Sequence, residues 1–244
     1  MLNRDPASAQ VACSFVGAGQ PVEALHHMPP AELWLIGTPD GTLEDALRDL
    51  LAAGRLRAGD GVFHLSGFTS SALFAERLSG EVAAASLHPV LSFADPRTAV
   101  AQFAGTLCGL EGERRLCAML RVLVAEIGGI CFDVDAARKP LYHAGSVFAS
   151  NFLVVLMDLA RKAYVEAGVP VEVADRLMLP LARKALDNVA AQGAAAALTG
   201  PAARGDHVVI AQQHAAVSHW DGPAGDAYAS LSALALRLAG RTPP

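Results

Sequence analysis

Residues 139–151, KPLYHAGSVFASN, open the longest apolar helix that the sequence predicts. Proline suits the first turn of a helix, because its missing N–H has no partner there, so we expect the helix to begin at Pro140. At about 100° per residue the polar side chains of this stretch share one face, with Asn151 on its flank. That polar row consists of Tyr142, His143, Ser146 and Ser150.

The polar row needs partners if this apolar helix is buried, since an unpaired buried polar group costs roughly 1–3 kcal/mol. Neighbouring side chains of the core can supply those partners, and so can a ligand in a cleft. The helix taken alone is compatible with both interpretations.

The composition narrows the classes of protein to consider. A chain of 244 residues, 52% of them hydrophobic, can form one large or two modest domains with a substantial core. Its net charge of −5, with both signs interspersed, argues against a nucleic-acid surface. The four cysteines form no C-x-x-C pair, so we expect reduced thiols and no metal site. No signal peptide or membrane-length apolar run is evident, which predicts a soluble, cytoplasmic protein without membrane contact.

Strands and helices alternate in the first half of the chain, which predicts a mostly parallel sheet with helical crossovers. The expected strands are 32–37, 61–65, 82–87, 105–110 and 130–134, with helices at 7–15, 42–53, 70–78 and 113–127. After Asp135 no strand-like run follows. Residues 1–135 are therefore expected to form an α/β domain, and residues 136–244 an all-α domain. Its expected helices are 140–167, 171–191, 206–219 and 224–239, with an interruption at 193–205.

Polar and glycine residues follow three of the predicted strands, at the sheet edge where open α/β sheets bind ligands. These short segments are Thr38-Pro39-Asp40, His64-Leu65-Ser66-Gly67 and Ser86-Leu87-His88-Pro89. Other interpretations exist for some of them. Pro39-Asp40-Gly41 is also good turn and helix-cap chemistry. His64 lies inside a strand, which favours a core residue over a catalytic base.

Four motifs together resemble one family of Rossmann-like, NAD(P)-dependent oxidoreductases with a C-terminal helical domain of unknown function. The motifs are HLSG (64–67), SLHPVLSF (86–93), KPLYHAGSVFASN (139–151) and ALTGPAARGD (197–206). The resemblance covers nearly the whole chain. Its layout is similar to that of pyrroline-5-carboxylate reductase, ketopantoate reductase and prephenate dehydrogenase, with a helical domain like the C-terminal domain of 6-phosphogluconate dehydrogenase.

The resemblance implies an NADP site and a homodimer formed through the C-terminal helices. Asn3-Arg4 matches the pair that meets the 2′-phosphate of NADPH in related reductases, and a guanidinium suits a phosphate. The TPD turn and Ser66-Gly67 resemble the cofactor side, and the HP pair the substrate side. Family members carry a glycine-rich strand-helix-strand before the Asn-Arg pair, whereas this sequence starts at that pair. We therefore expect an N-terminally incomplete Rossmann-like sheet whose exposed edge needs cover from a partner.

The resulting hypothesis is an NADP-dependent oxidoreductase acting on a small C=O or C=N metabolite in a cleft between the domains. His143 is the candidate acid or base, because an unperturbed imidazole titrates near neutral pH. Lys139 is the candidate for stabilising an oxyanion, and Asn151 for orienting the substrate or the nicotinamide. Expected substrate contacts are His88, Pro89, Tyr142, Thr199 and Arg204. For Arg204 a structural role in locking its loop is an alternative. The rival hypothesis is a non-catalytic metabolite-binding or regulatory dimer.

Overall fold

A computed structural model describes residues 1–93 and 95–242, which divide into two compact units. The first unit comprises Met1–Ser150 and the second Asn151–Pro244. The division falls later than the predicted boundary at Asp135, so the helix that carries the polar row belongs with the sheet. We describe each unit by itself.

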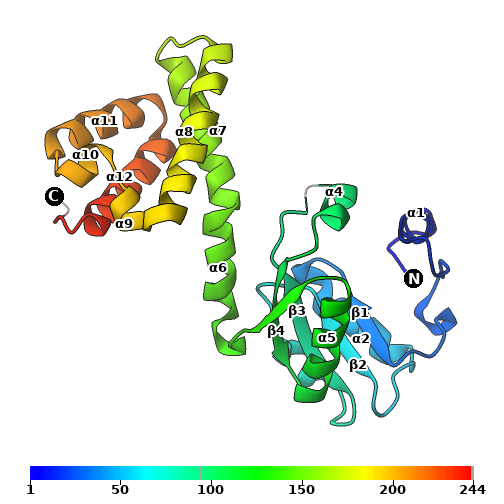
Figure 1. The fold of residues 1–244 in the computed structure, drawn as a ribbon. Coiled ribbons are helices and arrows are strands. Elements are labelled where there is room, and N and C mark those ends of the chain that lie inside the picture. The colour runs from blue at the N-terminus through cyan, green and yellow to red at the C-terminus, as the bar shows by residue number, and fades with distance from the viewer. Residues whose placement is uncertain (94, 243–244) are drawn as a thin grey trace. The chain divides into compact units, whose positions relative to one another are not determined.

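The first unit contains one five-stranded sheet with the strands in sequence order (Figure 1). The strands are β1 (Leu33–Ile36), β2 (Gly61–His64), β3 (Ala83–Pro89), β4 (Leu107–Gly112) and β5 (Ile130–Asp133). All five lie where the alternating pattern predicts them. Three of the four pairings are parallel, and β3 with β4 is antiparallel. The mostly parallel, Rossmann-like sheet is thereby confirmed.

The antiparallel pairing follows from the connection between β3 and β4. Pro89 ends β3 and lies opposite Cys108 at the start of β4, so the intervening chain leaves and rejoins the sheet at one edge. A connection that stays at one edge reverses the chain direction, whereas a parallel pair needs a crossover to the opposite edge. The connection contains α4 (Pro96–Ala101), a short helix that the sequence reasoning missed.

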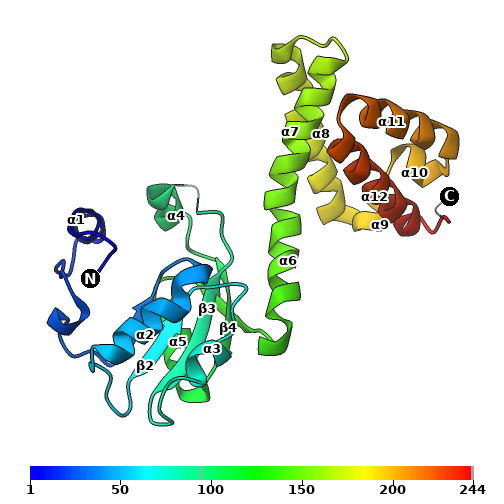
Figure 2. The same ribbon diagram turned by 180° about the vertical axis from the view of Figure 1, so that it is seen from behind.

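Helices cover both faces of the sheet. Helix α2 (Leu43–Ala52) lies on one face and α5 (Arg114–Glu126) on the other, as the two opposite views show (Figures 1 and 2). Three elements complete the helices of the first unit: α1 (Pro6–Val16), α3 (Ala72–Ala75) and α6 (Lys139–Ala149). Short 3-10 turns lie at η1 (Leu25–His27), η2 (Asp40–Thr42) and η3 (Ala136–Arg138).

Two apolar clusters fill the space between the sheet and its helices, one on each face. Val62 and Ala84 point into the cluster with α2, whereas their strand neighbours Phe63 and Ala85 point into the cluster with α5. Successive strand residues face opposite sides, so an almost continuous apolar run is what a strand buried on both faces requires. Buried leucines of the two amphipathic helices complete the clusters: Leu43, Leu47 and Leu50 of α2, and Leu116 and Leu120 of α5.

A buried ion pair joins the start of α6 to the sheet. The ammonium of Lys139 lies 3.3 Å from Oε1 of Glu111 on β4, and their side chains are 2% and 5% exposed. The ammonium also donates to the carbonyl of Ser66 at 2.9 Å and to the hydroxyl of Ser86. The backbone N–H and hydroxyl of Ser71 both donate to the Glu111 carboxylate. Burial lowers the pKa of Lys139, and the Glu111 carboxylate opposes that shift.

The second unit is entirely helical in its described part, as the sequence predicts. Its helices are α7 (Asn151–Glu166), α8 (Val171–Gln192), α9 (Ala194–Ala197), α10 (Gly200–Arg204), α11 (His207–Trp220) and α12 (Gly222–Leu238). The expected single helix 140–167 is interrupted at Ser150, whose φ and ψ of −124° and −71° are not helical. The predicted interruption at 193–205 contains the short helices α9 and α10. Asp206 caps α11 through the N–H of Val209.

We expect Glu111→Gln to lower the free energy of unfolding of the first unit by about 3–5 kcal/mol, because it leaves a buried ammonium without its carboxylate. Urea unfolding followed by fluorescence of the buried Trp34, in a Trp220→Phe background, measures this. The control is Arg48→Met, which removes an exposed pair with Asp45 in the same unit and should cost less than about 0.5 kcal/mol. Equal effects of the two substitutions would refute a structural role for the buried pair.

Candidate functional site

A cavity of about 470 Å³ lies at the carboxyl ends of β1, β2 and β3. The three predicted segments and His143 of α6 meet there, because neighbouring parallel strands end at the same sheet edge. The predicted residues that line it are Thr38, Pro39, Asp40, Ser66, Gly67, His88, Pro89 and His143. The volume suits a small metabolite or one end of a larger ligand.

Gly67 separates two imidazoles. A Cβ atom at this position would lie 2.6 Å from Nδ1 of His143 and 2.7 Å from Nε2 of His88, closer than van der Waals contact allows. The absence of a side chain at residue 67 is therefore what lets both rings approach the same point. The ring centroids of His88 and His143 are 5.7 Å apart, at an interplanar angle of 75°.

His88 contacts Tyr142 through its second ring nitrogen, Nδ1. Its Nδ1 lies 2.8 Å from the hydroxyl of Tyr142, one residue before His143 on α6. Burial, together with the nearby His143 and Lys139, lowers the pKa of His88 to about 4. Burial raises the pKa of the Tyr142 hydroxyl. Both side chains are therefore neutral at pH 7.

His143 carries a buried nitrogen without a protein partner. Among the described residues, Nδ1 of His143 is one of three buried side-chain polar atoms that make no hydrogen bond. Such atoms are uncommon in folded proteins and call for a water or a ligand. The polar row predicted on this helix is therefore only partly satisfied from within the protein, and its unsatisfied member lines the cavity.

Hydrogen bonds of Ser66 and Lys139 hold the loop that lines the cavity after β2. The hydroxyl of Ser66 accepts hydrogen bonds from the N–H groups of Phe68 and Thr69, at 3.1 and 2.7 Å. Its carbonyl accepts from the Lys139 ammonium. In the described part of the chain Lys139 does not line the cavity, and its charge is already paired with Glu111. Lys139 therefore contacts the Ser66-Gly67 loop, and its expected role in stabilising an oxyanion stays a prediction.

The other predicted site residues lie elsewhere. Asn3 and Arg4 precede α1, and the Arg4 side chain is 91% exposed, with Asp5 at 3.8 Å. Asn151, Thr199 and Arg204 belong to the second unit, where all three are exposed. None of these five residues lines the 470 Å³ cavity in the described structure.

Four lining residues were not among the predicted site residues: Gly37, Leu65, Leu91 and Phe93. Gly37 and Leu65 lie next to the predicted residues Thr38 and Ser66. Leu65, Leu91 and Phe93 are apolar and carry no chemical signature of their own. The motif SLHPVLSF (86–93) contains Leu91 and Phe93, and it is the feature of the sequence that could have indicated both residues as part of the site. His64 is fully buried, as its position inside a strand indicated, and its Nδ1 accepts from the N–H of Ser66 at 3.2 Å.

A larger groove of about 1190 Å³ lies between α3 and α5, but several of its charged groups already have partners. Arg115 donates to the carbonyl of Gly59 at 2.6 Å, Arg121 pairs with Asp133, and Glu111 binds Ser71 and Lys139. No cluster of three His, Cys, Asp or Glu side chains suited to a metal occurs among the described residues. The smaller cavity with the unsatisfied imidazole is therefore the better candidate site.

The fold and this cavity define a Rossmann-like α/β protein with a helical C-terminal region. The model of a domain of unknown function, DUF2520, matches residues 106–235, and the chain belongs to that family. No curated protein matches the sequence.

Solved structures share this fold. Protein TM1727 from Thermotoga maritima is 26% identical, with a TM-score of 0.76 over 98% of this chain and 89% of that chain. The proposed NADP oxidoreductase BF3122 from Bacteroides fragilis is 22% identical, with a TM-score of 0.76 over 97% and 87%. The pyrroline carboxylate reductase of Plasmodium falciparum, solved with NADP bound, is 10% identical, with a TM-score of 0.56 over 90% and 82%. The resemblance found in the motifs is thereby confirmed at the level of the fold.

We expect the free energy of unfolding of the first unit to fall as the pH falls from 6.5 to 4. Burial lowers the pKa values of His64 and His88 from 6.5 to about 4, so between these values the unfolded chain binds protons that the folded chain excludes. His64→Leu should make the pH dependence shallower, whereas His26→Leu, at an exposed position, should not. Urea unfolding at a series of pH values measures both slopes, and identical slopes would contradict a neutral, buried His64.

Proposed function

We propose that the protein is an NADP-dependent oxidoreductase that acts on a small C=O or C=N metabolite bound in the 470 Å³ cavity. The observation that carries this proposal is the pair of imidazoles that converge over Gly67 at the carboxyl ends of three parallel strands. One ring has a buried nitrogen that lacks a partner among the described residues. The similarity to structures of NAD(P)-dependent enzymes supports the proposal.

The residues around the cavity fit one end of a dinucleotide. The backbone of Gly67 leaves room for close approach, and Thr38, Pro39 and Asp40 line the same side. NADP, when bound, supplies a hydride to the substrate carbon or accepts one from it. Arg4 has an exposed guanidinium, with which it would meet the 2′-phosphate beside Asn3.

In this proposal His143 exchanges a proton with the substrate, and His88 and Pro89 contact it. Nδ1 of His143 gains a partner when a polar substrate group reaches it, which removes the cost of a buried, unsatisfied nitrogen. Lys139 positions the Ser66-Gly67 loop through the Ser66 carbonyl. Contacts of Asn151, Thr199 and Arg204 with the substrate stay predictions.

We expect NADPH to bind more tightly than NADH, and Gly67→Ala to weaken NADPH binding at least tenfold, or about 1.4 kcal/mol, because the new methyl group displaces both imidazoles. Isothermal titration calorimetry of both nucleotides measures this. Gly41→Ala is the matched control, since a Cβ there meets nothing within 4 Å and Gly41 neighbours the cavity-lining Asp40.

Failure of both nucleotides to bind would overturn the proposal. It would leave the second candidate, a non-catalytic protein that binds a metabolite in the same cavity. The volume of about 470 Å³ favours that candidate, because it accommodates a small molecule without a cofactor. A metabolite screen by thermal shift, with Gly67→Ala as the negative control, would then identify the ligand.

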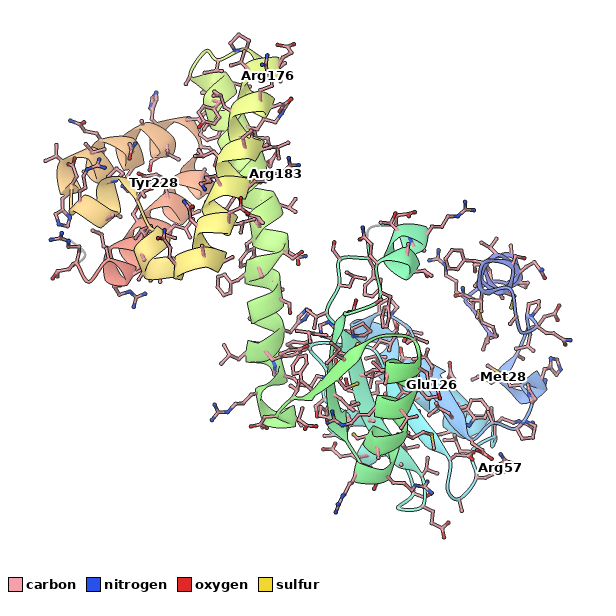
Figure 3. All side chains as sticks on the ribbon, in the orientation of Figure 1. Met28, Arg57, Glu126, Arg176, Arg183 and Tyr228 are labelled. Carbon is pink, nitrogen blue, oxygen red and sulfur yellow. The ribbon has the colours of Figure 1, made fainter. Side chains whose placement is uncertain are left out.

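We also propose that the second unit associates with a second copy of the chain, giving a soluble, cytoplasmic homodimer. The unit has few buried apolar residues: Ala174, Ile210, Ala224 and Leu236. Helix α7 has no buried residue, and α8 exposes Leu181 by 64% and Leu186 by 53%. The side chains of Arg176 and Arg183 extend from the same helix α8 (Figure 3). An apolar helix pair with a charged margin is typical of a protein interface.

Residues 136–166 also have the length and composition of a membrane-spanning helix, although interface helices pass the same test.

We expect Leu181→Lys to shift the chain from dimer to monomer in sedimentation velocity without detergent, because a charge would be buried at the interface. Val208→Lys, at an equally exposed position on α11, should leave the dimer intact. A monomer for the unmodified chain at micromolar concentration would contradict the dimer, and a requirement for detergent would indicate membrane association.

A further inference from the structure

The imidazole of His88 carries one N–H proton, which can lie on either of its two ring nitrogens. It is neutral at pH 7, because burial and its neighbours hold its pKa at about 4. A neutral imidazole has one N–H donor and one bare acceptor nitrogen, and its surroundings decide which nitrogen is which. Nδ1 faces the Tyr142 hydroxyl at 2.8 Å, and Nε2 lies beside Gly67 at the cavity.

The Tyr142 hydroxyl occupies a space that a second glycine leaves open. Gly109 of β4 lies opposite His88 of β3, and a Cβ at residue 109 would lie 2.6 Å from the hydroxyl oxygen. The same Cβ would lie 2.9 Å from Cγ2 of Val134, so the surroundings are partly apolar. Among the described residues, His88 Nδ1 is the hydrogen-bond partner of this hydroxyl.

The proton on the Tyr142 hydroxyl determines the direction of the hydrogen bond between Tyr142 and His88. Tyr142 keeps its proton at pH 7, because burial raises its pKa. If His88 donated from Nδ1, the phenol proton of the half-buried Tyr142 would have no acceptor among the described residues, which is costly. If Tyr142 donates, both groups are satisfied. The His88 proton must then be on Nε2.

We infer that Tyr142 is a positioning residue that fixes His88 as the Nε2–H tautomer, so that His88 presents one hydrogen-bond donor to a ligand oxygen in the cavity. Tyr142 does not line the cavity among the described residues, so it acts through His88 rather than on the ligand. The earlier expectation of direct substrate contact by Tyr142 is replaced by this indirect role.

A fixed donor selects the chemical class of the substrate, an assignment that rests on the oxidoreductase function proposed above. A hydroxyl accepts from His88 Nε2–H and donates to His143 Nδ1. On oxidation the hydroxyl proton would pass to His143, bound NADP would supply the acceptor for the hydride from the carbon, and the C=O product would still accept from His88. A protonated imine has N–H groups but no lone pair for this donor. The site therefore selects the carbonyl–hydroxyl couple over the imine–amine couple.

Nitrogen-15 NMR of the histidine-labelled chain at pH 7 tests the tautomer directly. The chain has eight histidines, and the His88 signals are those lost in His88→Gln. We expect Nε2 to be protonated and Nδ1 bare in the unmodified protein, and a mixture of tautomers in Tyr142→Phe. Tyr228→Phe, which removes a hydroxyl bonded to Gln213 in the second unit, should leave the His88 signals unchanged.

Gly109→Ala is a second variant that displaces the Tyr142 hydroxyl without removing it, and it should have the same effect on the His88 tautomer. A protonated Nδ1 in the unmodified chain, or an unchanged tautomer in both variants, would overturn the positioning role.

Two five-membered rings of equal size, cyclopentanone and 1-pyrroline, test the substrate class in the same spectra. With both probes at pH 6, where 1-pyrroline is protonated, we expect millimolar cyclopentanone to shift the His88 Nε2–H signal and 1-pyrroline to leave it unchanged. A larger shift with 1-pyrroline, or no shift with either probe, would overturn the assigned class. Neither measurement needs a cofactor, so their failure is distinguishable from a failure of NADPH to bind in the titration.

Discussion

The buried pair of Lys139 and Glu111 is the interaction on which the candidate site depends. Two charges enclosed at 2% and 5% exposure are tolerated only when they are paired and fully hydrogen-bonded, which fixes their geometry. The pair joins β4, β3, the loop after β2 and the first residue of α6. Tyr142 and His143 follow Lys139 by three and four residues. They therefore share its face of the helix and are placed beside His88 and Gly67.

Two glycines make the space that this helix face occupies. Gly67 lets the imidazoles of His88 and His143 approach one point, and Gly109 admits the Tyr142 hydroxyl beside His88. Neither glycine has a positive φ, so the requirement is for room and not for an unusual backbone conformation. The protein gives up side-chain packing at both positions. Two imidazoles line the cavity as a result, and the Tyr142 phenol contacts one of them from outside the lining.

Much of this arrangement followed from local pattern. The five strands, the loops at their carboxyl ends and His143 as a member of the site were all predicted from alternation and from the rule that parallel strands end together. The features of the fold that the sequence pattern did not predict have physical causes. Helix α4 is six residues long and lies between loops, too short for a periodic signal. The antiparallel β3–β4 pair depends on where a connection re-enters the sheet, which periodicity does not encode.

The sequence by itself determined the Rossmann-like class, the helical second half and the set of polar residues that gather at one sheet edge. Each of these depends on spacing along the chain, and spacing is a local property. Only the tertiary structure decided that Lys139 is buried, that Tyr142 bonds His88, and that Gly67 and Gly109 are essential gaps. Those facts depend on which atoms from segments far apart in sequence come within a few ångströms of one another.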